Sequence, residues 1–84
     1  MVIQVLESDG EPVSRSRIVI VQQNPALPEM AFESDDEGKI TVAITGDRFR
    51  AEILGPGGGH LASSDFYDTP PHHENVQLTI RLPP

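Results

Sequence analysis

The sequence predicts an all-β fold, a seven-stranded antiparallel two-sheet sandwich without a substantial helix, in a single domain over residues 1–84. Three observations favour this fold. Apolar and polar residues alternate with a period of two in several segments, whereas no window of ten or more residues has the 3.6-residue apolar period of a helix. Eight prolines and seven glycines divide the chain into short elements. Turn signals recur at roughly the 8–12-residue spacing typical of an antiparallel sandwich.

Four strands are expected in the first half of the chain, at residues 2–6, 15–23, 30–34 and 39–45. The SDGEP segment after the first of them has the composition of a turn. The β-branched run at 18–21 favours a central strand with little exposure on either face. The prolines of 24–28 exclude a helix interior or a central strand there, so the short strand that follows is expected at a sheet edge.

Three more strands are expected at residues 48–54, 60–68 and 76–82. Gly46 and Asp47 have the composition of a tight hairpin between 39–45 and 48–54. The GPGGG segment 55–59 predicts a hairpin tip, and the prolines of 69–75 predict a loop. Each strand has an apolar face that must meet another sheet. The expected inward residues are Ile40, Val42, Ile44, Phe49, Ala51, Ile53, Val76, Leu78, Ile80 and Leu82.

The acidic stretch FESDDEGKITVAI, residues 32–44, has some features of a calcium loop. An EF-hand loop starting at Glu33 would have its glycine at Gly38, but its twelfth position falls on Ile44, which cannot bind a cation. The flanking segments also alternate as strands, so this is not an EF-hand. We favour a β-turn with Gly38 at positive φ. A looser calcium site remains an alternative, with the ligands Asp35, Asp36 and Glu37.

The net charge of −7, from thirteen acidic and six basic residues, argues against a nucleic-acid partner and against an anionic membrane surface. No segment approaches the ~20 apolar residues of a transmembrane helix, so no membrane insertion is expected. The chain has no cysteine, which excludes disulfides and thiolate metal sites. No signal peptide is visible: we expect a cytoplasmic protein if Met1 is the native start, and an extracytoplasmic domain if the sequence belongs to a larger exported protein.

Three histidines, His60, His72 and His73, form the basis of an alternative prediction, a metal-dependent (calcium or zinc) module or small enzyme. Oxygen ligands for such a site are available nearby, at Asp65, Asp68 and Glu74. The histidines lack a known ligand spacing, so solvated loop residues are the favoured interpretation. No glycine-flanked serine or phosphate loop is present. We therefore expect no enzyme activity and no cofactor.

Two arginine pairs, Arg15/Arg17 and Arg48/Arg50, have i, i+2 spacing and are expected to line one face of their strands. If the two strands are close, four guanidinium groups form a basic stripe that binds a carboxylate-bearing partner. The alternative is cross-strand pairing within the chain, with Glu7, Glu11 or Glu52.

Four segments resemble the carboxypeptidase regulatory-like domain of the transthyretin-like (prealbumin-like) β-sandwich group: VLESDGEPV (5–13), SRIVIVQ (16–22), SDDEGKITVAI (34–44) and RFRAEILGPG (48–57). The resemblance covers about two thirds of the chain. SRSR replaces the family's usual alanine-rich entry to the second strand, and Ile40 replaces the usual aromatic residue. The resemblance implies a non-catalytic accessory module that contacts proteins or glycans. Hydroxyisourate hydrolase, an enzyme of the same group, is excluded because its Tyr-Arg-Gly-Ser ending and its N-terminal histidine are absent.

Our expectation is therefore a non-enzymatic β-sandwich that serves as a binding or structural module. Its protein partner would be contacted through loops and sheet edges, in a larger secreted or envelope assembly. The edges expected to pair with a second copy or a partner are residues 30–34 and the C-terminal strand. A glycan-binding accessory module is a further alternative, although the chain has no tryptophan and one tyrosine to stack on sugars.

Overall fold

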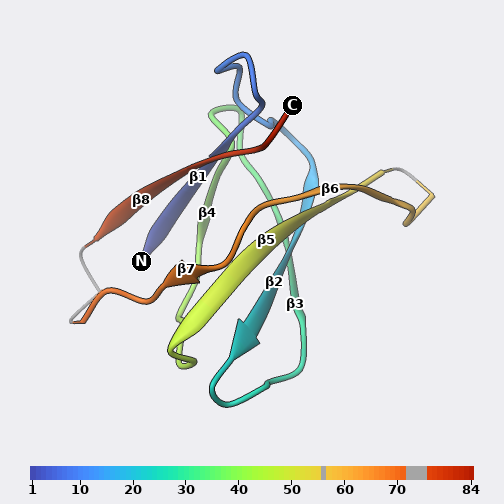
Figure 1. The fold of residues 1–84 in the computed structure, drawn as a ribbon. Coiled ribbons are helices and arrows are strands. Elements are labelled where there is room, and N and C mark those ends of the chain that lie inside the picture. Colours follow the sequence, from blue (N-terminus) through green and yellow to red (C-terminus); the bar gives the residue numbers. More distant parts are fainter. Residues whose placement is uncertain (56, 72–75) are drawn as a thin grey trace.

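A computed structural model describes residues 1–55, 57–71 and 76–84, and in these residues the fold is all-β with two sheets and no helix (Figure 1). The eight strands are β1 (Val2–Leu6), β2 (Arg17–Gln23), β3 (Met30–Glu33), β4 (Lys39–Thr41), β5 (Arg48–Leu54), β6 (His60–Ser63), β7 (Tyr67–Asp68) and β8 (Gln77–Arg81). None of the described residues forms a helix long and apolar enough to cross a membrane.

The first sheet has the order β4-β1-β8, and the second has the order β3-β2-β5-β6, with β7 also paired to β5. The two sheets lie on opposite sides of the molecule in Figure 1, an arrangement compatible with a β-sandwich. The predicted all-antiparallel arrangement is wrong at one place, because β1 and β8 run parallel. The predicted number of strands also differs, since the described chain contains eight.

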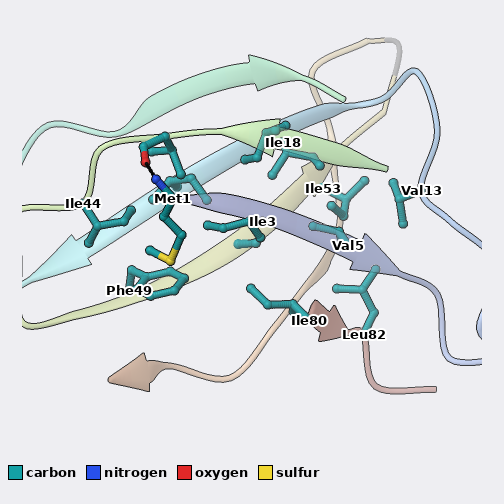
Figure 2. Close-up of a cluster of buried hydrophobic side chains, with 14 residues drawn as sticks. Met1, Ile3, Val5, Val13, Ile18, Ile44, Phe49, Ile53, Ile80 and Leu82 are labelled. Carbon is teal, nitrogen blue, oxygen red and sulfur yellow. Dashed lines mark hydrogen bonds between the residues drawn. The ribbon is translucent and has the colours of Figure 1, made fainter. Parts of the chain in front are cut away.

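The hydrophobic core lies between the two sheets and follows the period-two alternation of the strands. Figure 2 shows Ile3 and Val5 of β1 and Ile80 of β8 among the side chains of the opposite sheet, including Phe49 of β5. All the predicted inward residues are buried or packed against this core. Burial of these apolar side chains is the main force that holds the sheets together.

β2 is the central strand that its β-branched run predicts. It pairs with β3 on one side and β5 on the other, and Ile18, Val19 and Ile20 are all buried. Because Ile18 and Ile20 point into the core, Val19 and Arg17 lie on the outer face of this sheet.

The predicted hairpin at Gly46 and Asp47 is wrong. β4 pairs with β1 and β5 pairs with β2, so these residues carry the chain from one sheet to the other. The buried side chain of Gln22 holds the crossing in place, since its Oε1 accepts hydrogen bonds from the backbone N–H groups of Thr45 (2.9 Å) and Gly46 (2.8 Å). A Cβ at Gly46 would stand 2.6 Å from the carbonyl oxygen of Gln23, which explains the glycine.

The predicted strand 60–68 is divided in two, because Ser64 interrupts it. The Ser64 N–H donates to the Ala51 carbonyl (2.9 Å), and the Ala51 N–H donates to Ser64 Oγ (3.0 Å). A side-chain oxygen therefore replaces the backbone acceptor of a regular ladder, and β6 and β7 remain attached to β5.

The predicted β-turn in the acidic stretch is confirmed. The N–H of Gly38 donates to the Asp35 carbonyl, and Gly38 has a φ of 76°. The Asp35 carboxylate accepts hydrogen bonds from the N–H groups of Glu37 and Lys39, both at 2.9 Å. The turn connects β3 in one sheet to β4 in the other.

Candidate binding surface on the outer face

A depression of about 340 Å³ lies at one end of the outer face of the β3-β2-β5-β6 sheet. We call it the Arg17–Leu61 surface, and its lining consists of Arg15, Ser16, Arg17, Glu33, Leu54, Gly55 and Leu61. Two of the six basic residues of an acidic chain line this one depression.

The register of the sheet places three of these side chains in one row. Arg17 of β2 lies opposite Glu33 of β3 on one side and opposite Leu54 of β5 on the other. Residues directly opposite in paired strands point to the same face. The row therefore presents an acid, a base and an aliphatic side chain, in that order across the sheet.

Leu61 reaches this surface because the ladder between β5 and β6 is irregular. Ile53 pairs with Ala62 but Leu54 pairs with His60, so Leu61 is the additional residue of a β-bulge. Its side chain lies over Gly55, where a Cβ would stand 3.4 Å from the Leu61 side-chain carbons. Leu61 is 67% exposed, and it is the large apolar side chain that the described part of the chain leaves most open to solvent.

The two arginines of this surface differ in whether they pair with an acidic side chain. Arg15 Nε donates a 2.7 Å hydrogen bond to Asp36 Oδ1, and this bond raises the pKa of the Arg15 guanidinium. Arg17 is exposed and forms no ion pair with any described residue, including its cross-strand neighbour Glu33. Arg17 is thus the positive charge at this site that is free to meet an incoming anion.

The expectation that Arg15 shares a strand face with Arg17 is wrong, because Arg15 has a φ of 50° and lies in the turn before β2. The second pair, Arg48 and Arg50, lies toward the other end of the same sheet, where Arg48 is opposite Gln23. Arg15 and Arg17 thus lie at one end of the β2–β5 ladder, and Arg48 and Arg50 lie toward the other end. The four guanidinium groups do not form one stripe.

The Arg48/Arg50 pair is largely occupied within the chain. Both guanidinium groups lie over the ring of Phe66, at 5.3 and 5.2 Å from its centroid. Arg50 also pairs with Glu52 at 2.7 Å, but both residues are on β5, so this is not the cross-strand pairing that the alternative predicted. Arg48 Nε lies 3.8 Å from Asp68 Oδ1 on the neighbouring β7. Nε of Arg50 is buried without a hydrogen-bond partner among the described residues.

The three acids of the looser calcium hypothesis each have a partner within the chain. Asp35 accepts the two backbone hydrogen bonds described above, and that from Lys39 is the main reason why its pKa is lowered. Asp36 pairs with Arg15, and Glu37 pairs with Lys39 at 3.0 Å. Among the side chains that the structure describes, no group of three or more His, Asp or Glu residues is arranged to hold a metal ion.

The histidine hypothesis falls mostly outside the described residues, where His72, His73 and Glu74 lie. His60 is the first residue of β6. Asp65 lies in the interruption between β6 and β7, and Asp68 ends β7.

Sequence reasoning identified Arg15 and Arg17 but missed Glu33, Leu54 and Leu61. Leu54 and Glu33 follow only from the register of β2 with its two neighbours. Leu61 follows from the bulge, for which the adjacent glycines of 55–59 were the available signal. The resulting surface combines an unpaired guanidinium with an exposed aliphatic side chain. No family model, curated protein or solved structure matches this chain.

Proposed function

We propose that this chain is a non-enzymatic β-sandwich module, of the carboxypeptidase regulatory-like type, that binds a protein partner through the Arg17–Leu61 surface. The observation that carries the proposal is the unpaired guanidinium of Arg17 beside the exposed Leu61 and the partly buried Leu54 in one depression. The partner segment carries a carboxylate for Arg17 and an aliphatic or aromatic side chain for the two leucines.

The chemistry of each half of the depression supports this choice of partner. An arginine binds a carboxylate through two parallel N–H···O bonds, and arginine is common among the residues that dominate binding energy at interfaces. An exposed leucine is stabilised when a partner removes it from water, by roughly 25 cal/mol for each Å² of apolar surface buried.

A non-catalytic role is supported by the two buried serines of the chain. Ser34 Oγ donates to the Val13 carbonyl at 2.6 Å and accepts a hydrogen bond from the N–H of Ser16. Ser64 Oγ donates to the Asp65 carbonyl and accepts from Ala51. Both hydroxyls connect backbone segments and so serve the fold.

Peptide phage display on the immobilised domain tests the proposal. We expect enrichment of peptides in which Asp, Glu or the terminal carboxylate stands within two residues of Leu, Ile, Val or Phe. Fluorescence anisotropy with the selected peptide then compares variants. R17E and L61S are each expected to weaken binding about tenfold or more, which corresponds to ~1.4 kcal/mol. E33Q is expected to strengthen it, because this change removes the acid beside Arg17.

The matched control is R81E, which makes the same change in charge at another exposed arginine, on β8 of the other sheet. R81E is expected to leave the affinity unchanged. If R17E and R81E weaken binding equally, the effect is one of overall charge and the Arg17–Leu61 surface is not the site. Selected peptides without an acidic group would also contradict the proposal.

A further inference from the structure

Within residues 1–55, 57–71 and 76–84, no strand pairs with the outer edge of β8. The Val2 N–H donates to the Val76 carbonyl, and the Leu82 N–H donates to the Leu6 carbonyl. These bonds show that residues 76, 78, 80 and 82 direct their N–H and C=O groups toward β1, since successive residues of a strand point to opposite sides. Gln77, Thr79 and Arg81 therefore direct theirs away from β1, where no described strand pairs with β8.

The other sheet edges are shorter, interrupted or acidic. On β4, the C=O of Lys39 accepts a hydrogen bond from the N–H of Asp35, and the N–H of Lys39 donates one to the Asp35 carboxylate. Both backbone groups of Lys39 are therefore already bonded. On β3, the outward residues are Ala31 and Glu33, and the strand has four residues. The β6/β7 edge is interrupted at Ser64. Short, charged and interrupted edges are the features by which proteins prevent unwanted strand pairing. β8 is uninterrupted over five residues and carries one charge, Arg81 at its end.

The outward row on β8 is also self-complementary. Gln77, Thr79 and Arg81 are spaced symmetrically about Thr79, so two antiparallel copies related by a two-fold axis at Thr79 bring every outward N–H opposite an outward C=O. In that register Arg81 faces Gln77 of the second copy, and like charges do not meet. Two β3 strands paired in the same way would form a shorter ladder, with only Ala31 and Glu33 outward, and would add two acidic side chains to a contact between chains of net charge −7.

We infer that the outer edge of β8 pairs antiparallel with β8 of a second copy of this chain. The pairing joins two three-stranded sheets into one of six, with the order β4-β1-β8-β8-β1-β4. It lies on the sheet opposite the Arg17–Leu61 surface and leaves that surface open, so the inference stands independently of the proposed function.

The association is weak and strengthens with salt. The contact consists of one short ladder, at the lower end of interface sizes, for which we expect a dissociation constant of roughly 10 μM to 1 mM. Each copy has a net charge of −7, so their mutual repulsion opposes pairing. Added NaCl screens this repulsion without affecting the backbone hydrogen bonds.

Sedimentation velocity from about 5 μM to 1 mM protein, the range that brackets the expected dissociation constant, measures the association. We expect monomer at the lower end, dimer at the upper end and a shift toward dimer in 0.5 M NaCl, where screening is nearly complete. Amide hydrogen exchange locates the contact: the N–H groups of Thr79 and Arg81 exchange more slowly at high protein concentration, whereas those of Ala31 and Glu33 on β3 do not.

The variant T79P removes an N–H that forms no bond within the described chain, so the monomer keeps its ladder to β1. We expect it to melt near the wild-type temperature when dilute and to raise the dissociation constant at least tenfold. T79K is a second variant, which places two like charges opposite each other at the two-fold axis. A31P, the matched control, removes an outward N–H on β3 and leaves the dimer intact.

A protein that remains monomeric at 1 mM, the upper end of the expected range, would overturn the inference. So would a dimer whose affinity is unchanged in both T79P and T79K, because such a dimer uses another surface.

Discussion

Gly38 and Gly58 both have a positive φ, but their surroundings differ. At Gly38, with a φ of 76°, a Cβ would stand 2.6 Å from the Val5 carbonyl oxygen and 3.0 Å from the Val13 nitrogen. At Gly58, with a φ of 81°, a Cβ would meet nothing within 4 Å. The turn glycine is therefore required both for its backbone conformation and for the close approach of β1.

We expect Gly38→Ala to lower the free energy of unfolding by roughly 2–4 kcal/mol, since strain at positive φ adds to a backbone collision. Gly58→Ala adds only the strain of positive φ and is expected to lower it by about 1–2 kcal/mol. Urea denaturation of the two variants measures the difference. Equal losses would show that the collision with Val5 is relieved by a small shift of the turn.

At the scale of elements, Ser64 decides whether β6 and β7 remain attached to β5. Its hydroxyl accepts the N–H of Ala51, a fully buried residue of β5, at the point where the edge strand is interrupted. Without this oxygen, the Ala51 N–H would be buried without a partner, because the regular ladder does not continue there. The edge strand on the side of Leu61 thus depends on one hydroxyl.

We expect Ser64→Ala to lower the free energy of unfolding by about 1–3 kcal/mol, the cost of a buried unsatisfied donor. Amide exchange at Ala51 should also become faster. Ser63→Ala is the matched control, because Ser63 forms no side-chain hydrogen bond with a described residue, and a change within about 0.5 kcal/mol is expected there. If both variants lose the same stability, the Ser64 hydroxyl does not hold the edge.

For the whole molecule, the net charge of −7 is distributed over a body with extents of 30 × 23 × 21 Å. At low ionic strength the screening length is comparable to these dimensions, so the acidic groups repel one another across the fold. The ion pair Arg15–Asp36 is exposed and the pair Lys39–Glu37 is partly exposed, so the two offset little of this repulsion.

We therefore expect the melting temperature of the dilute protein to rise by about 2–4 °C between ~10 mM and ~200 mM NaCl, from relief of roughly 0.5 kcal/mol of repulsion. Thermal unfolding followed by circular dichroism measures it. Arg17→Glu makes the net charge two units more negative at a residue without an ion pair, and should give a steeper rise. A melting temperature that falls with salt would mean that attractive pairs dominate.

The sequence by itself determined the all-β class, the positions of most strands, the inward residues and the acidic turn. These features depend on local alternation and on turn chemistry, which a single sequence carries. Residues 39–45 illustrate the limit. Their alternation correctly predicts that Ile40 and Ile44 are in the core, but it does not predict that the next strand, β5, belongs to the other sheet.

Only the tertiary structure decided which strands are neighbours, and with that the candidate site. The crossing at Gly46, the parallel pairing of β1 with β8 and the row Glu33–Arg17–Leu54 all arise from pairing between segments far apart in the chain. A strand with an apolar face can form its backbone hydrogen bonds with any of several other strands. The choice among them is made by the packing of one shared core, and that choice is what brings a free arginine beside an exposed leucine.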